Sequence, residues 1–161
     1  MASMVFKGIN DYIAQLQKLG NDTDEIIGKA VYQGAAIVAD AIKAEINALP
    51  IDKGYGTADN PCIGVNAIQK KGLVDGFGIS KMQNERGYIN VKLGFAGYNG
   101  LKTKKYPNGQ PNALIARAVV SGTSFRRPNQ FIDRAQKSVK AAAEEKMRIV
   151  IDEEINALTE V

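Results

Sequence analysis

The fold is decided at Ser121-Gly122-Thr123-Ser124-Phe125-Arg126-Arg127-Pro128-Asn129-Gln130-Phe131, a segment that leads directly into the longest helical pattern of the 161-residue chain. Its first part predicts a turn, because glycine adopts positive φ readily and the two hydroxyl side chains can bond nearby backbone. Pro128 fixes φ where a helix can begin, and Phe131 opens an apolar stripe. The segment is therefore either a demanding helix entry or a contact surface for a partner. Residue chemistry alone favours the helix entry, and both interpretations stay open.

Two long helices are predicted on either side of the middle of the chain. The C-terminal helix runs from about Pro128 to Leu158, with apolar residues at helical spacing. The other starts near Asp22-Thr23, where Glu25 can complete a capping box, and runs to about Ala48, before Pro50. Its predicted apolar stripe consists of Ile27, Val31, Ala35, Val38, Ile42, Ile46 and Leu49. A short amphipathic helix is also predicted over residues 5–19.

The middle of the chain predicts loops and a hairpin. Residues 50–72 and 96–112 are rich in glycine and proline, which favours long flexible loops. Between them, residues 73–82 and 88–95 predict a β-hairpin with its turn at residues 83–87. Residues 113–120 are either a short helix or a buried strand, with the helix favoured. The chain is thus expected to be one α+β domain over residues 1–161. A small antiparallel β-sheet packs against two long helices, with a short N-terminal helix beside them.

Charge is unevenly distributed along the chain. Residues 64–128 hold eleven Lys/Arg and two acids, whereas residues 1–63 hold five bases and eight acids, and residues 129–161 hold five bases and seven acids. The middle is therefore clearly basic and the terminal regions are mildly acidic. Such asymmetry favours an anionic partner or head-to-tail contact between copies of the chain.

The basic residues suggest two candidate contact sites. Arg126 and Arg127 have no acid close in sequence before Asp133. They could bind phosphate or form bidentate pairs with carboxylates of another subunit, and the acidic terminal regions favour the subunit contact. Lys102, Lys104 and Lys105 lie between two tyrosines in the second loop, a composition that suits phosphate or single-strand contact. A solvated surface loop is the favoured alternative there.

The residues that catalysis usually requires are missing. The chain has no histidine, and its single cysteine, Cys62, therefore has no histidine to activate it. No metal-ligand spacing and no phosphate-binding glycine motif occurs, so we expect no enzyme, no metal and no cofactor. One cysteine fits a reducing compartment, and no apolar run approaches the ~20 residues that span a bilayer. We therefore expect no membrane association.

The Gly-Thr-Ser turn, the short basic segment, Pro128 and Phe131 resemble the tail-completion, or head–tail joining, proteins of long-tailed bacteriophages. Residues 112–117, Asn-Ala-Leu-Ile-Ala-Arg, are similar to the family's segment before the turn. The order of helices, glycine-rich loop and β region also agrees. Many members carry an acid shortly before the turn, where this chain has Val119-Val120-Ser121.

The resemblance implies a structural virion protein of the neck or tail end, assembled in the host cytoplasm. It would form a ring, hexameric in related proteins, that joins the head connector to the tail and contacts other neck or tail proteins. DNA would pass through the lumen without sequence-specific binding. Subunit-interface candidates are Gly122, Thr123, Ser124, Arg126, Arg127, Pro128 and Phe131. The alternative is a nucleic-acid-binding accessory protein that uses the basic middle.

Overall fold

A computed structural model describes Ile13, Gly20 and residues 23–159. The helix predicted over residues 5–19 lies, apart from Ile13, outside the described residues. The rest contains helices α2 (Thr23–Ala48), α3 (Ala67–Gly76), α4 (Asn112–Ser121) and α5 (Phe131–Thr159). It also contains strands β1 (Phe77–Ile79), β2 (Gln83–Glu85), β3 (Tyr88–Asn90) and β4 (Leu93–Phe95). The α+β prediction with two long helices is confirmed.

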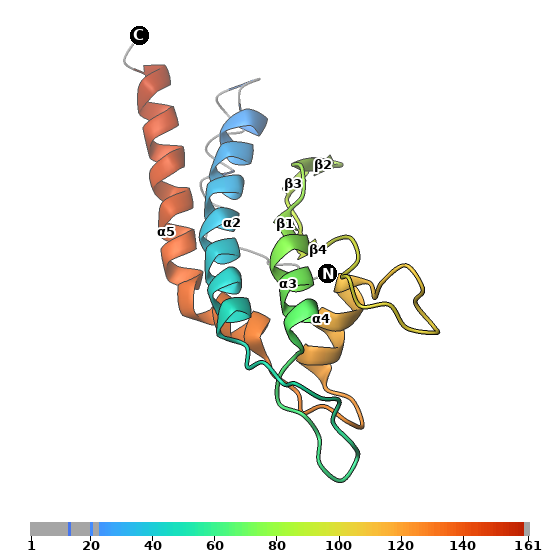
Figure 1. Cartoon of the computed structure of the whole chain (residues 1–161). Coiled ribbons are helices and arrows are strands. Elements are labelled where there is room, and N and C mark those ends of the chain that lie inside the picture. The colour runs from blue at the N-terminus through green and yellow to red at the C-terminus, as the bar shows by residue number, and fades with distance from the viewer. Residues whose placement is uncertain (1–12, 14–19, 21–22, 160–161) are drawn as a thin grey trace.

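Helices α2 and α5 form one side of the molecule, side by side along most of their length (Figure 1). Both long helices were predicted to within a few residues, because each carries an apolar stripe at helical spacing. Most of the predicted α2 stripe is buried, including Val38, Ile42 and Ile46. An ion pair between Lys29 and Glu154 joins the start of α2 to the end of α5. The Glu154 carboxylate, through its hydrogen bond, raises the pKa of Lys29 above its ordinary value.

Helices α3 and α4 and the strands form the other side, so that α2 lies between them and α5 (Figure 1). The predicted hairpin is present but divided into two antiparallel ribbons, β1–β4 at its base and β2–β3 at its tip. The turn was predicted too long, because residues 83–85 form strand β2. Arg86 and Gly87 make the turn with φ of 57° and 84°. Positive φ at both positions is the turn geometry that fits the twist of a two-residue hairpin.

The first loop and the first strand were wrongly placed, because residues 67–76 form helix α3. The loop therefore ends at Asn66, and the strand begins at Phe77. Asn66 and Gln69 form a capping box, in which each side chain accepts a hydrogen bond from the other's backbone. Gly72 weakened the helical pattern of residues 67–76 in the sequence. A glycine is nevertheless required at position 72, because a Cβ atom there would lie 2.5 Å from Asn112 Oδ1. Residues 113–120 belong to helix α4, which confirms the prediction of a helix over that of a buried strand.

The core has two parts along α2. The larger contains Ile42, Ile46, Leu73 and Phe131, where α2, α3, the strands, α4 and the start of α5 meet. The smaller contains Ile26, Ala30, Met147 and Ile151, where the start of α2 meets the second half of α5. Among the described residues, no helix is both long and apolar enough to cross a membrane.

Candidate assembly surface

The predicted turn follows α4 directly. Gly122 ends the helix with φ of 72°, a conformation that glycine adopts without strain. Thr123 and Arg126 then exchange backbone hydrogen bonds: the Thr123 N–H donates to Arg126 O at 2.9 Å, and the Arg126 N–H donates to Thr123 O at 3.3 Å. This closes a tight turn in which Thr123 and Ser124 are exposed.

The residues after the turn connect α4 to α5. The Asn129 N–H donates to Val119 O at 2.8 Å, and the Gln130 side chain donates to Val120 O at 3.0 Å, so two carbonyls of the last turn of α4 are satisfied. Phe131 is fully buried and its ring meets Phe95 edge-on. The segment is therefore a helix entry, anchored in the core at Phe131.

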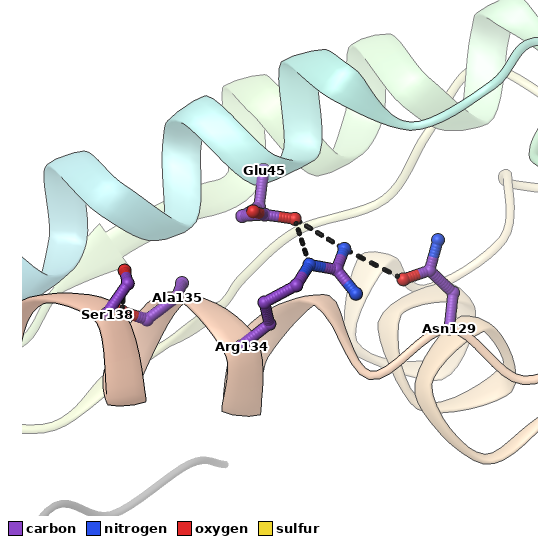
Figure 2. A network of polar contacts seen from close by, with 5 residues as sticks. All are labelled: Glu45, Asn129, Arg134, Ala135 and Ser138. Carbon is purple, nitrogen blue, oxygen red and sulfur yellow. Dashed lines mark hydrogen bonds and ion pairs between the residues drawn. The ribbon is translucent and has the colours of Figure 1, made fainter.

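A polar network fixes α5 against the end of α2 close to this entry. Arg134 donates from Nε to Glu45 at 3.0 Å and from Nη2 to Asn129 Oδ1 at 3.2 Å, as Figure 2 shows. The hydrogen bond with Glu45 raises the pKa of Arg134. The network is exposed, so it orients the start of α5 more than it stabilises the fold.

The first long loop is tied to this turn by backbone hydrogen bonds. The Cys62 N–H donates to Phe125 O, and the Arg127 N–H donates to Cys62 O, both at 2.9 Å. The loop is also closed at its base, since the Asp52 N–H donates to Val65 O at 2.9 Å and the Val65 N–H donates to Pro50 O at 3.0 Å. Residues 51–66 and 122–127 therefore form one unit, here called the loop assembly. Its flexibility stays a prediction, concentrated in residues 53–61 between the tied ends.

Gly56 lets the two parts of the loop assembly approach closely. A Cβ atom at this position would lie 2.0 Å from Phe125 O and 2.3 Å from Cys62 N. Both neighbours are backbone atoms, which cannot move aside as a flexible side chain can. The loop assembly therefore depends on a glycine at position 56.

Arg126 is buried, with 6% of its surface exposed, whereas its neighbour Arg127 is exposed. Its Nη2 donates to Gln69 Oε1 at 3.3 Å, and Gln69 in turn donates to Gln110 at 2.9 Å. Nε and Nη1 of Arg126 are buried and find no partner among the residues that the structure describes. Arg126 thus connects the loop assembly to α3 and to the second loop, and only Arg127 is available at the surface.

The loop assembly presents large apolar side chains to solvent. Tyr55 is 66% exposed, and Ile51, Ile63 and Phe125 are also exposed. They belong to the first loop and the turn, two segments that project together at one end of the molecule (Figure 1). Large apolar side chains exposed on neighbouring segments are typical of contact surfaces.

The lysine-bearing second loop is a separate feature. The Asn99 N–H donates to Gln110 O at 2.9 Å, and the Asn112 N–H donates to Gly97 O at 3.0 Å, which ties both ends. Lys102, Lys104 and Lys105 are exposed, and none forms an ion pair with any described residue. Lys105 lies 5.6 Å from the Tyr106 ring centre. The structure does not join this loop to the exposed tip of the loop assembly.

The sequence identified the turn but missed its partner, residues 51–66. Backbone hydrogen bonds between distant segments leave no local pattern in the sequence. The sequence therefore could not indicate that residues 51–66 pair with the turn. Gln69 could have been found from its capping-box spacing to Asn66. Among the described residues, no group of three His, Cys, Asp or Glu side chains could hold a metal ion.

Comparison with known proteins identifies the family. The model of the HK97-gp10-like family, described as "Bacteriophage HK97-gp10, putative tail-component", matches residues 10–99. This range includes α2, α3, the strands and the first loop, but not the turn at residues 121–131. No curated protein and no solved structure matches the chain. Since the match covers more than half of the sequence, the chain belongs to the HK97-gp10-like family of bacteriophage tail components.

Proposed function

We propose that this tail component assembles into a closed homo-oligomeric ring, a hexamer as the resemblance implies, at the neck or tail end of the virion. There it joins the head connector to the tail, and DNA passes through its lumen. Assembly would take place in the host cytoplasm before the ring meets other neck or tail proteins. The chain acts by assembly and not by turnover, which its lack of histidine supports.

The observation that carries this proposal is the two-sided charge of the molecule. Helices α2 and α5 form one side and together carry ten acidic and seven basic residues. The other side is built mainly from residues 64–128, with eleven basic residues and two acids. A closed ring requires one face of each subunit to meet a different face of the next. Two sides of opposite charge fit that requirement.

Sedimentation velocity across a salt series tests this arrangement. We expect one closed species at low salt and its dissociation as salt screens the contacts. Arg127→Ala should shift dissociation to lower salt, because Arg127 is the exposed arginine of the turn. Lys53→Ala, an exposed residue of the first loop that forms no ion pair with any described residue, is the control. A monomer at every salt concentration would contradict the ring.

A second candidate function is nucleic-acid binding, and the three exposed lysines of the second loop favour it. Filter binding of single-stranded DNA at low salt would detect it. Binding that is lost when Lys102, Lys104 and Lys105 are replaced by alanine, in a protein that remains monomeric, would support this alternative over the ring.

A further inference from the structure

The structure contains an apolar groove on the side of the strands and α4. Its volume is about 580 Å³, and it lies between α4, the start of α5, β1, β4 and Ile42 of α2. Apolar side chains dominate its lining, among them Phe77, Leu93 and Ile132. Pockets that enclose ligands have volumes of about 300–1,000 Å³, so this groove can accept the tip of a loop.

The rim of the groove is accessible. Leu114 is 40% exposed although it borders the apolar lining, and Arg117 lies on the same helix and is exposed. None of residues 51–66 lines the groove, so the chain's own loop does not fill it. A groove with an apolar lining and one exposed apolar rim residue is suited to a partner segment that brings apolar side chains.

The loop assembly supplies side chains of that kind. Tyr55, Ile63 and Phe125 are exposed, and backbone hydrogen bonds at Cys62 hold the segments that carry Ile63 and Phe125. These held segments lose less conformational freedom on binding than free ones, whereas Tyr55 lies in the part of the loop that we expect to be flexible. The same chain thus carries an apolar projection and an apolar groove at different places.

One pair of charges beside these two surfaces is complementary, and Asp133, the acid that also lines the groove, is already paired with Lys137. Asp59 is exposed in the loop, and Arg117 is exposed beside the groove. Neither forms an ion pair within the part of the chain that the structure describes. An Asp59 carboxylate brought to the groove would therefore meet a free guanidinium, which sets the orientation of the contact.

We propose that the groove is the docking site for the loop assembly of a second copy of the chain, with Tyr55 inserted beside Leu114. This inference rests on the proposed ring and adds an apolar contact to the contact between its oppositely charged sides. Each subunit gives its loop to one neighbour and receives a loop from the other. The contact is heterologous, as a closed ring requires.

Mixed disulfide formation tests the contact. Two single-cysteine proteins are prepared in a Cys62→Ser background, one with Tyr55→Cys and one with Leu114→Cys. A disulfide forms only where the two Cα atoms come within about 7 Å, so docking should give a mixed dimer under mild oxidation. The control pairs Tyr55→Cys with Leu158→Cys, an exposed position near the far end of α5. The inference predicts a several-fold higher yield of mixed dimer than the control gives, and equal yields would overturn it.

A second variant measures assembly directly. Leu114→Asp should raise the concentration needed for half-assembly by about tenfold or more, as loss of a buried interface side chain does. Leu158→Asp is the matched control and should change it little. Leu114 is outside the core, so the variant should fold normally. If the protein assembles but Leu114→Asp has no effect, the groove contact fails and the ring stands; if the unmodified protein stays monomeric, both fail.

Discussion

At the residue scale, buried polar side chains connect distant segments of the chain, and not all of these contacts stabilise the fold. Arg126 is the clearest case, since one guanidinium nitrogen bonds Gln69 while two others are buried and unpaired within the described structure. A buried charge without an anion costs free energy. Gln69, in contrast, has bonding partners in its own capping box, in Arg126 and in Gln110.

These two residues should therefore respond differently to replacement. Arg126→Met keeps a side chain of similar size and removes the uncompensated charge, so the free energy of unfolding should be unchanged or higher. Gln69→Leu leaves the partners of Gln69 unsatisfied and should cost about 1–3 kcal/mol. Urea unfolding of both variants measures the difference. A large loss of stability in Arg126→Met would show that the guanidinium has a strong partner.

The close approach at Gly56 gives a second residue-scale prediction. Gly56→Ala places a methyl group against the backbone at Phe125 and Cys62, and should separate the loop from the turn. Gly54→Ala, two residues away, meets nothing within 4 Å and is the control. Limited proteolysis should cut residues 53–61 faster in Gly56→Ala only. Equal cleavage of both variants would show that the loop is not held at this point.

At the element scale, the long helices were predictable because the sequence pattern that specifies each helix lies within the helix itself. Both α2 and α5 carry apolar residues at a regular spacing over more than twenty residues. Helix α3 was not predicted because it is short and contains Gly72, whose role depends on Asn112 and Asn99 in distant segments. The groove was likewise unpredictable, since five helices and strands from separate parts of the chain build it.

The pairing of α2 with α5 can be tested with two residues of one helix. Met147 is fully buried against α2, and Ile149, two residues later, is exposed. Met147→Ala should cost about 2–5 kcal/mol because it leaves a cavity. Ile149→Ala should change stability by less than about 0.5 kcal/mol. Similar losses measured by urea unfolding would mean that α5 packs on α2 through a different face.

At the scale of the whole molecule, the chain has features that a single copy leaves unused. Its loop assembly exposes apolar side chains, its groove is open, and its two sides differ in charge. Family membership alone places it among phage tail components. The proposed ring would account for these features, because each would meet its complement on a neighbouring copy.

Negative-stain electron microscopy of the purified chain at low salt tests the ring most directly. The account predicts closed particles of uniform size with a central hole, which disappear at high salt and in the Leu114→Asp variant but persist in Leu158→Asp. Monomers, or open filaments without closure, in the unmodified protein at low salt would contradict it.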